Sequence, residues 1–368
     1  MKIVINAIPL LSPLTGVGNY TYNLITEFRK LKQDFDYTYY YGYFTRKLKF
    51  YSGESEMFYR IKESIKKLPL VSSYARNLKS RLAHLQLKNY DIYFEPNFIP
   101  LNIKARKTVT TVYDFSFYRY PEWHPVDRVE YFSKNFFKRI KKSDVIITIS
   151  KYVEKEALEI LKIRDTKVMT VYPGYNAVFS TVENNRIKNR LDNYILFVGS
   201  IEPRKNLIGL LNAYLLLPEY IKRDFKLLLV GFKGWGNSEI LGLLNKLRGN
   251  VEYLGYVDTE ELTNLYRGAS CFAYPSLYEG FGLPPLEAMA CGCPVVVSNV
   301  ASLPEVCGDA ACYVDPYNVE NIAEGIRKVL TDKTLKLSLI EKGLERAKLF
   351  SWEKSAKEYI KVFEEISG

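Results

Sequence analysis

The chain has 368 residues, which is enough for two domains of ordinary size. Hydrophobic residues make up 47% and charged residues 25%, a globular composition without any run of about 18 apolar residues, so we expect no transmembrane helix. Five cysteines and two histidines favour neither a disulfide framework nor a zinc site. The expected location is therefore a reducing cytosol.

The formal net charge of +11 is unevenly distributed. Lys and Arg outnumber Asp and Glu by 11 to 3 from Arg46 to Lys88, and by 6 to 1 from Arg128 to Lys142. Aromatic residues are interleaved with both runs. Three interpretations are open: solvated helix faces, an anionic membrane or lipid-diphosphate surface, and a nucleic-acid surface.

The N-terminus predicts the start of a Rossmann-like unit. Lys2 to Ala7 is typical of a buried strand rather than a secretion signal, because a Gly-bearing loop and a helix pattern follow without a cleavage site. Gly16 and Gly18 lie in that loop, before an amphipathic helix expected from about Tyr20 to Lys32. Amides at such a helix start can bind phosphate, although a plain tight turn is the alternative.

Strands and helices then alternate, which predicts a mainly parallel sheet covered on both faces. We expect strands at Tyr37–Tyr43, Asp91–Glu95, Thr108–Tyr113, Val145–Ser150 and Lys167–Tyr172, and helices at Pro125–Lys142 and up to Lys162. Tyr113 and Asp114 close one strand, where such sheets bind ligands. Asp114 could instead cap a helix or accept a buried hydrogen bond.

The second half repeats this α/β architecture after a polar linker expected at Thr181 to Arg190. The expected strands are Tyr194–Gly199, Lys226–Gly231, Val251–Tyr256, Cys271–Pro275 and Val295–Ser298, and the expected helices are Asn206–Leu217, one capped by Asp258, Asn318–Thr331, Lys333–Leu349 and Trp352–Ile366. Asp258 with Glu261 forms a capping-box pattern. Two doubly wound domains would bring the carboxyl ends of both sheets to one cleft.

The segment from Tyr278 to Val297 is the most informative. It places Glu279 and Glu287 eight positions apart, on a loop and one turn into a helix. The turn between them is Gly280-Phe281-Gly282, followed by Leu283, Pro284 and Pro285. Prolines suit a first helical turn, and the amides of Phe281, Gly282 and Leu283 would face an anion. A sugar phosphate is a ligand that suits both the amides and the two carboxylates.

A second cluster directly follows the Tyr194 strand, in Gly199-Ser200-Ile201-Glu202-Pro203-Arg204-Lys205-Asn206. Arg204 and Lys205 beside a helix start offer two cations and free amides to a diphosphate. An exposed basic turn is the alternative interpretation.

These motifs together resemble the family-four retaining glycosyltransferases of GT-B fold. The resemblance rests on GSIEPRKN, the Gly turn after Leu228 to Val230, LGYV, and YPSLYEGFGLPPLEAMACGCPVVVSN followed by LPEV. It covers nearly the whole chain and is most specific from Phe197 to Asp315. The fold it implies is two Rossmann-like parallel-sheet domains facing across a cleft.

The resemblance also implies roles for individual residues. Glu279 would contact the donor sugar near its anomeric centre, and Glu287 would hold the ribose. The leaving diphosphate would be neutralised by Arg204 and Lys205. Further donor contacts would come from Gly16, Gly18, Ser200, Gly280, Phe281, Gly282 and Leu283, and a polar residue near the cleft would be Ser150. The implied N-terminal domain spans 1–178 with the returning helix 350–368, and the C-terminal domain spans 179–349.

One departure from the family pattern concerns a histidine. The His-Asp pair that usually ends the fourth strand is Tyr113-Asp114 here. Tyrosine offers a hydroxyl but no cation. His124, ten residues after Asp114, could take over the role, or it could be an ordinary loop or helix-cap histidine.

The expected activity is transfer of a hexosyl group, with retention, from a nucleotide diphosphate sugar to a sugar or polyprenyl-diphosphate-linked glycan acceptor. The group implied is a mannosyltransferase-like one of O-antigen or other polysaccharide assembly, using GDP-mannose at the inner membrane face and no metal or cofactor. UDP- and dTDP-sugars remain alternatives. A sugar-nucleotide epimerase of the same architecture is a rival, as is a basic nucleic-acid-binding protein, which would leave Glu279 and Glu287 unexplained.

Overall fold

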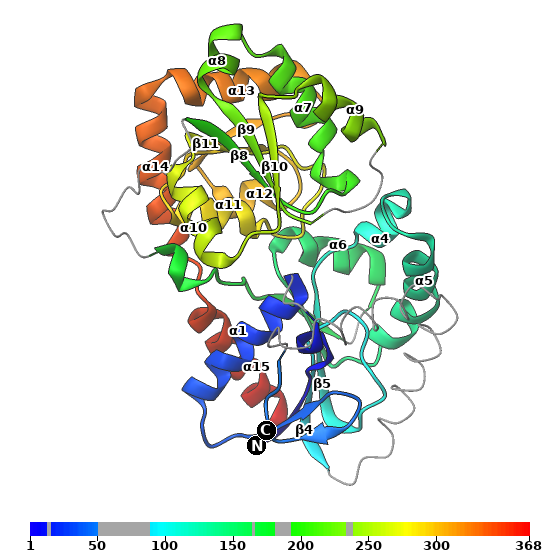
Figure 1. The fold of residues 1–368 in the computed structure, drawn as a ribbon. Coiled ribbons are helices and arrows are strands. Elements are labelled where there is room, and N and C mark those ends of the chain that lie inside the picture. Colours follow the sequence, from blue (N-terminus) through cyan, green and yellow to red (C-terminus); the bar gives the residue numbers. More distant parts are fainter. Residues whose placement is uncertain (13–15, 51–88, 164–165, 181–192, 233–237) are drawn as a thin grey trace. The chain divides into compact units, whose positions relative to one another are not determined.

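The chain divides into two compact units in a computed structural model that describes residues 1–12, 16–50, 89–163, 166–180, 193–232 and 238–368 (Figure 1). Unit 1 comprises Met1–Gly174 with Trp352–Gly368, and unit 2 comprises Tyr175–Ser351. Most of the first basic run, the predicted linker at 181–190 and the residue before Gly16 lie outside the described residues.

The described part of unit 1 holds a seven-stranded sheet in the order β3-β2-β1-β4-β5-β6-β7. Its strands are β1 (Lys2–Asn6), β2 (Asp36–Tyr40), β3 (Phe44–Thr45), β4 (Tyr90–Glu95), β5 (Ala105–Val112), β6 (Val145–Thr148) and β7 (Lys167–Thr170). All neighbours pair in parallel except β2 and β3. A short hairpin return makes that edge pair antiparallel.

Helices cover both faces of this sheet. They are η1 (Ile8–Leu11), α1 (Gly16–Leu31), α4 (Ser116–Arg119), η3 (Pro121–Trp123), α5 (Val126–Ile140), α6 (Lys151–Leu161) and α15 (Trp352–Ser367). Successive strand residues point to opposite faces. Thr111 accordingly meets α15, whereas Val112 joins a buried cluster that includes Phe136 of α5 and Val153 of α6.

The helix α15 is held in unit 1 by a buried polar contact within an aromatic core. Its Tyr359 hydroxyl lies 2.8 Å from the Tyr20 hydroxyl of α1 and 2.7 Å from Thr111 Oγ1 of β5. The helices α1 and α15 run side by side, and the two chain ends meet, with Ser367 Oγ 3.0 Å from the sulfur of Met1 (Figure 1). The last helix of the chain therefore packs on the sheet that the first half of the chain forms.

The described part of unit 2 holds a six-stranded parallel sheet in the order β10-β9-β8-β11-β12-β13. Its strands are β8 (Tyr194–Val198), β9 (Lys226–Val230), β10 (Val251–Gly255), β11 (Cys271–Tyr274), β12 (Val295–Ser298) and β13 (Ala311–Val314). The four inner strands are almost wholly buried, because helices pack on both of their faces.

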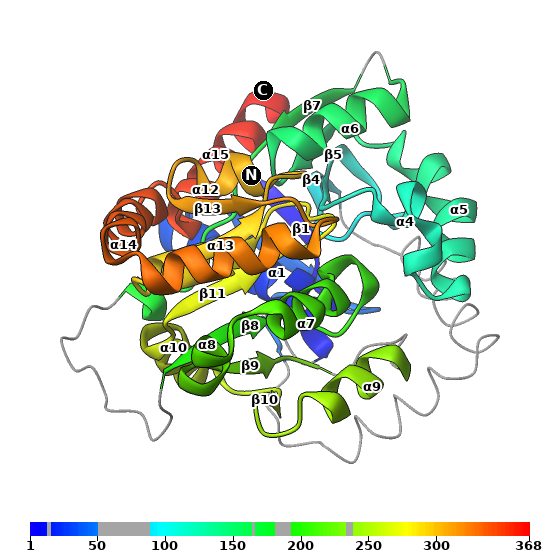
Figure 2. The same ribbon diagram turned by 90° about the horizontal axis from the view of Figure 1, so that it is seen from above.

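Helices of unit 2 form two layers. They are η4 (Ala177–Ser180), η5 (Pro203–Lys205), α7 (Leu207–Leu216), α8 (Glu219–Asp224), α9 (Ser238–Lys246), α10 (Thr259–Gly268), α11 (Leu283–Ala290), α12 (Leu303–Cys307), α13 (Val319–Thr331) and α14 (Lys333–Ala347). One layer contains α7, α9 and α13, and Figure 2 looks onto α7 and α13. The other contains α10, α11 and α14.

The predicted elements are confirmed to within a few residues at most ends, and local signals explain the agreement. Asp258 caps α10 by accepting from the Glu261 amide at 2.8 Å, and Asn318 caps α13 in the same way. The start of α1 was predicted wrongly. The helix begins at Gly16 rather than near Tyr20, so both glycines lie in its first turn, where amides lack intrahelical partners.

Among the described residues, none of the helices is long and apolar enough to cross a membrane.

Replacing Tyr359 with Phe should destabilise unit 1. The change leaves the Tyr20 hydroxyl and Thr111 Oγ1 buried without their shared partner, which costs about 1–3 kcal/mol. Urea unfolding followed by circular dichroism measures this loss. Tyr118, which is 52% exposed, is the matched control, and its replacement with Phe should leave the curve unchanged. Equal curves for the two variants would contradict the assigned role of Tyr359.

Candidate functional site

The carboxyl ends of the strands in unit 2 form one edge of its sheet, because neighbouring strands are parallel. The loops after β8 and β9 approach closely there. A Cβ on Gly231 would lie 2.1 Å from the carbonyl oxygen of Gly199, and its φ of +141° also requires glycine. The predicted Ser200 follows on the same loop, partly buried, with its backbone beside Gly231.

Three of the predicted residues meet at this edge. Lys205 Nζ lies 2.6 Å from Glu279 Oε1, and Arg204 donates from a terminal guanidinium nitrogen to Glu279 Oε2 at 3.0 Å. Arg204 also forms an ion pair with Glu202 at 2.8 Å. Tyr274, at the end of β11, accepts from Lys205 and donates to Glu279 at 2.9 Å. Lys205 and Glu279 are only 7% and 5% exposed.

Burial and the neighbouring charges act in opposite directions on the pKa values of Lys205 and Glu279. Burial acts to raise the pKa of Glu279, but the positive charges of Lys205 and Arg204 outweigh it, so that pKa lies below its usual range. Burial, followed by the Arg204 charge, lowers the pKa of Lys205, while Glu279 acts in the opposite direction. Burial and the Glu279 charge raise the pKa of Tyr274, which keeps its hydroxyl protonated. Two cations are therefore held beside two carboxylates.

The loop that carries the cations is fixed by Asn206. This residue has a left-handed backbone (φ 54°) between η5 and α7, and its side-chain oxygen accepts from the Gly209 amide at 3.2 Å. Its side-chain nitrogen donates to the carbonyls of Pro275 and Pro316, at 3.0 and 2.7 Å. The Leu277 amide donates to the Arg204 carbonyl at 2.8 Å. The loops after β8 and β11 are thus joined by a backbone hydrogen bond as well as by ion pairs.

The Glu279 loop leads into α11. Ser302 Oγ lies 2.8 Å from both the Glu279 and the Phe281 carbonyl oxygens, so its hydroxyl stabilises the turn between these two residues. Gly282 is the N-cap, with φ +113°, and a Cβ there would lie 2.7 Å from Leu303 Cδ2. Two prolines follow in the first turn, as predicted. Within the described part of the chain, the Gly282 and Leu283 amides donate to no acceptor.

Glu287 lies on the partly exposed stripe of α11, one turn beyond Leu283. Burial raises the pKa of Glu287 to about 7, and the Tyr266 hydroxyl donates to it at 3.1 Å. In the described residues Glu287 and Glu279 share no hydrogen-bond partner. The pKa of Glu279 is therefore shifted below its usual range and that of Glu287 above it.

Sequence reasoning missed an exposed aromatic pair at the same edge. Phe232 follows β9 and Tyr256 follows β10, and their rings stack with centroids 4.6 Å apart. They are 42% and 63% exposed, which is unusual for stacked rings of this size. The sequence signal that could have found them is a glycine at the end of a strand followed directly by an aromatic residue, as in Gly231-Phe232 and Gly255-Tyr256.

In unit 1 the predicted glycines lie at the start of α1. Gly16 is exposed and Gly18 is buried. A Cβ on Gly16 would meet none of the described atoms within 4 Å.

Tyr113, which stands at the family's histidine position, makes its hydrogen bond and its ring contacts within unit 1. Its hydroxyl donates to the Pro96 carbonyl, and its ring packs edge-on against Tyr20 at 5.0 Å. Burial raises the pKa of Tyr113 far above its ordinary value. Its hydroxyl is therefore a structural donor that stays protonated.

Asp114 and His124 are connected through Ser116. Asp114 Oδ1 accepts from the Ser116 amide at 2.9 Å and from its hydroxyl at 2.7 Å. His124 Nε2 lies 3.0 Å from the same hydroxyl, and the ring is buried. Because the single hydroxyl proton is directed to Asp114, Nε2 donates to Ser116. Asp114 thus stabilises a turn at the start of α4, and His124 is brought close to it.

Ser150 and Glu95 are buried at the carboxyl ends of two parallel strands, β6 and β4, which β5 separates. Ser150 caps α6 by accepting from the Val153 amide at 3.1 Å. Glu95, which sequence reasoning missed, receives hydrogen bonds from Asn6 Nδ2 at 2.9 Å and from the Tyr93 hydroxyl at 2.5 Å. Burial raises the pKa of Glu95 to about 8. A Glu-Pro pair directly after a strand was its only sequence signal.

No group of three or more His, Cys, Asp or Glu side chains that could hold a metal ion occurs in the residues that the structure describes.

Comparison with known proteins places these features in a family. The profile described as Glycosyltransferase Family 4 matches residues 14–178, and that described as Glycosyl transferases group 1 matches residues 181–346. O-antigen chain mannosyltransferase B of Escherichia coli is 34% identical over 379 residues, covering 99% of each chain.

Solved structures agree on the fold. Sucrose-phosphate synthase from Thermosynechococcus elongatus, a GT-B enzyme, superposes with a TM-score of 0.68 at 20% identity, over 99% of this chain and 98% of that one. Anabaena HepE in complex with UDP and glucose gives 0.68 at 16% identity, over 99% and 100%. With two parallel-sheet units, profile matches to both halves and a full-length relative above 30% identity, the chain belongs to glycosyltransferase family 4 and is a glycosyltransferase of GT-B fold.

Proposed function

We propose that this glycosyltransferase moves a mannosyl group from GDP-mannose to a hydroxyl of a glycan acceptor, with retained configuration, in the assembly of a surface polysaccharide. The donor and acceptor classes are supported by the full-length relative, which is named as an O-antigen chain mannosyltransferase. The observation that carries the proposal is the buried Arg204–Lys205–Glu279 cluster beside the open amides of α11.

The cluster suits a departing diphosphate. Lys205 uses two of its three ammonium hydrogens on Tyr274 and Glu279, which leaves one donor. The guanidinium of Arg204 is about a fifth exposed. These cations and the amides of Gly282 and Leu283 would stabilise the charge that develops as the sugar–phosphate bond breaks. On this proposal no metal or other cofactor is required, because protein cations supply the charge.

The proposed transfer proceeds on one face of the sugar. The bond from the anomeric carbon to the phosphate oxygen breaks, and its electron pair leaves with the nucleoside diphosphate. The acceptor oxygen bonds to the same face and passes its proton to the departing phosphate oxygen. Glu279, which stays ionised, would steady the positive charge on the sugar while it positions Arg204 and Lys205.

The nucleoside would be recognised at two places. Glu287 would accept from the ribose hydroxyls, the role that the resemblance implies, because it lies on α11 one turn beyond the helix start that would hold the phosphates. The exposed rings of Phe232 and Tyr256 would stack on the base, since every nucleobase has a flat face. A base stacked there explains why two large rings remain in solvent.

The glycan acceptor is assigned to unit 1. Gly16 and Gly18, in the first turn of α1, stay predicted contacts of the donor phosphates, as the resemblance implies. Because the Tyr113 hydroxyl is already bound, His124 is the better candidate for the missing histidine, held near Asp114 by Ser116. The nucleic-acid alternative explains the net charge but not the buried ion cluster.

Unit 1 is also proposed to dock on an anionic membrane at the inner membrane face, where a polyprenyl-diphosphate-linked acceptor would reside. The helix α5 carries four exposed lysines in and just after its last turns, Lys134, Lys138, Lys141 and Lys142. Its aromatic residues Phe132 and Phe136 are packed inward. The outer face is therefore basic rather than apolar, which suits a charged headgroup surface.

Replacing Arg204 with Ala should lower turnover with GDP-mannose by about 100-fold or more, because a donor to the developing diphosphate charge is lost. Transfer and donor hydrolysis are measured over GDP-, UDP- and dTDP-sugars, in the presence of EDTA. Arg223, which is exposed and pairs only locally with Asp224, is the control position. Arg204→Lys should recover part of the rate.

Turnover by Arg204→Ala close to that of Arg223→Ala, with both proteins folded in a thermal-shift assay, would refute the role of Arg204. Hydrolysis of a UDP- or dTDP-sugar in preference to GDP-mannose would replace the proposed donor.

Donor affinity should rise as the pH increases through about 7. Burial raises the pKa of Glu287 to about 7, so the carboxyl is mostly neutral below that pH and ionised above it. Only the ionised form accepts from both ribose hydroxyls with both oxygens. Calorimetric titration with GDP-mannose from about pH 6 to about pH 8 measures the trend. In Glu287→Gln the affinity should be weaker and flat with pH, and a slope equal to the wild-type slope would contradict the assignment.

Binding to liposomes should increase with anionic lipid and fall with added salt, because screening weakens attraction between exposed charges and the surface. Replacing Lys134, Lys138 and Lys142 together with Gln should reduce sedimentation with such vesicles. A triple Gln variant at Lys246, Lys333 and Lys342 of unit 2 removes the same charge and is the control. Equal losses in both would show that net charge, not α5, governs binding.

A further inference from the structure

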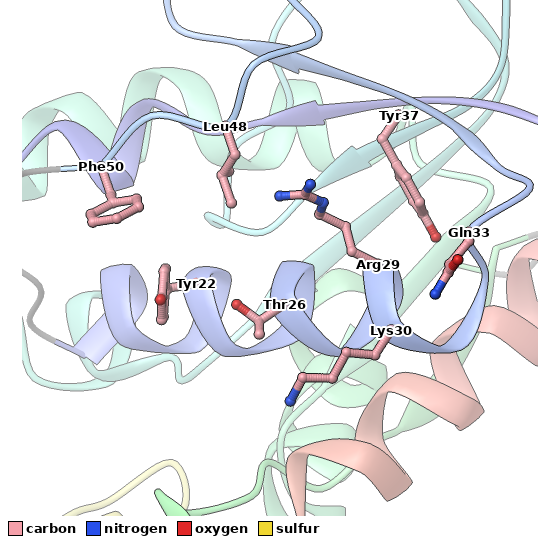
Figure 3. Close-up of a pocket in the computed structure, with 8 residues that line it drawn as sticks. All are labelled: Tyr22, Thr26, Arg29, Lys30, Gln33, Tyr37, Leu48 and Phe50. Atoms are coloured by element: carbon pink, nitrogen blue, oxygen red, sulfur yellow. The ribbon is translucent and has the colours of Figure 1, made fainter.

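A pocket of about 620 Å³ lies on the outer face of α1, away from the residues discussed above. Tyr22, Thr26, Arg29 and Lys30 line one wall along the helix, and Leu48 and Phe50 face them from the chain after β3 (Figure 3). Gln33 and Tyr37 close the end beyond α1. The volume lies within the range usual for small-molecule sites.

We propose that this pocket binds sugar units of the acceptor glycan, at a subsite separate from the reacting end. The inference rests on the proposed function, because it assumes a glycan acceptor. The lining joins aromatic surface to groups that exchange hydrogen bonds with hydroxyls. Sugars present the same pair of features, a C–H face that packs on a ring and a rim of hydroxyls.

The aromatic surface is supplied by Tyr22 and Phe50, whose rings meet edge to face with centroids 5.6 Å apart. Phe50 is 51% exposed, so apolar surface is left open to a ligand. At the other end the Tyr37 hydroxyl donates to the Phe28 carbonyl at 3.2 Å, which fixes its ring. The two aromatic ends therefore flank a polar middle.

The polar middle carries little net charge. Lys30 is paired with Glu27 at 2.6 Å, whereas Arg29 has no ion pair or hydrogen bond within the described ranges. One unpaired guanidinium, the Thr26 hydroxyl and the Gln33 amide can donate to and accept from hydroxyl groups. A diphosphate or a phospholipid surface would call for several unpaired cations. The chemistry favours a neutral or weakly anionic glycan.

The shape suits a chain rather than a single sugar. From Tyr22 to Lys30 the wall follows the helix for about 12 Å, at about 1.5 Å per residue. Tyr22 lies about 9 Å along the axis from Gly16, which begins α1. A glycan in the pocket would therefore be directed along α1 toward the carboxyl edge of the unit 1 sheet, where the reacting end is proposed to bind.

The test is calorimetric titration of the full chain with a short and a long α-linked mannooligosaccharide. We expect Tyr22→Ala and Arg29→Ala to weaken binding of the long one by about tenfold each. Tyr43→Ala is the control, since Tyr43 is 50% exposed on the same unit and does not line the pocket. The KM for the long acceptor should rise in parallel, with the KM for the short acceptor and the rate of donor hydrolysis unchanged.

Undiminished binding of the long oligosaccharide in both pocket variants would overturn the proposal, as would no binding by the wild-type chain. Displacement of the oligosaccharide by inorganic phosphate, or loss of anionic-vesicle binding in the pocket variants alone, would reassign the pocket to an anion. Failure of the proposed function is distinguishable, because it is read from donor hydrolysis, which needs neither oligosaccharide nor pocket.

Discussion

The buried bond between Lys205 and Glu279 is the interaction on which the site in unit 2 depends. It joins the loop after β8 to the loop after β11, two strands that are neighbours in the sheet. Removing Glu279 would leave the buried Lys205 ammonium without the carboxylate that it contacts, which typically costs about 3–5 kcal/mol. Arg204 and Tyr274 complete the arrangement, since each contacts Glu279 as well. Both basic side chains are therefore held in position before any ligand arrives.

Three backbone features position the loops that carry the Lys205–Glu279 ion pair. Gly231 permits the β8 and β9 loops to approach, and Asn206 turns the chain from the cation loop into α7 while holding two carbonyls. Gly282 takes a left-handed conformation that directs the chain from Glu279 into α11. The same turn leaves its own amide and that of Leu283 open. A structural requirement for charge pairing thus produces a surface suited to an anion.

Unit 1 uses the equivalent edge of its sheet differently. Tyr113, Asp114 and Ser150 all follow parallel strands, as in unit 2, but each hydrogen-bonds within the unit. Glu95 is likewise tied to Asn6 and Tyr93. Among the described residues of unit 1, the pocket along α1 is the feature on which the proposed glycan subsite rests, and it is lined from a helix rather than from strand ends.

The sequence alone determined the α/β class and most elements, because periodicity, capping and glycine turns are local properties. It also predicted that Arg204, Lys205 and Glu279 lie near strand ends, and the structure brings these three residues together. The predicted start of α1 was wrong for a local reason as well, because glycines in the first turn of a helix have the sequence pattern of a loop. Only the tertiary structure decided which residues form hydrogen bonds with one another across long sequence separations. Tyr274 and Lys205 are 69 positions apart, and Tyr359 meets Thr111 across 248. Such contacts follow from strand order and register, which long-range packing sets and no local pattern encodes.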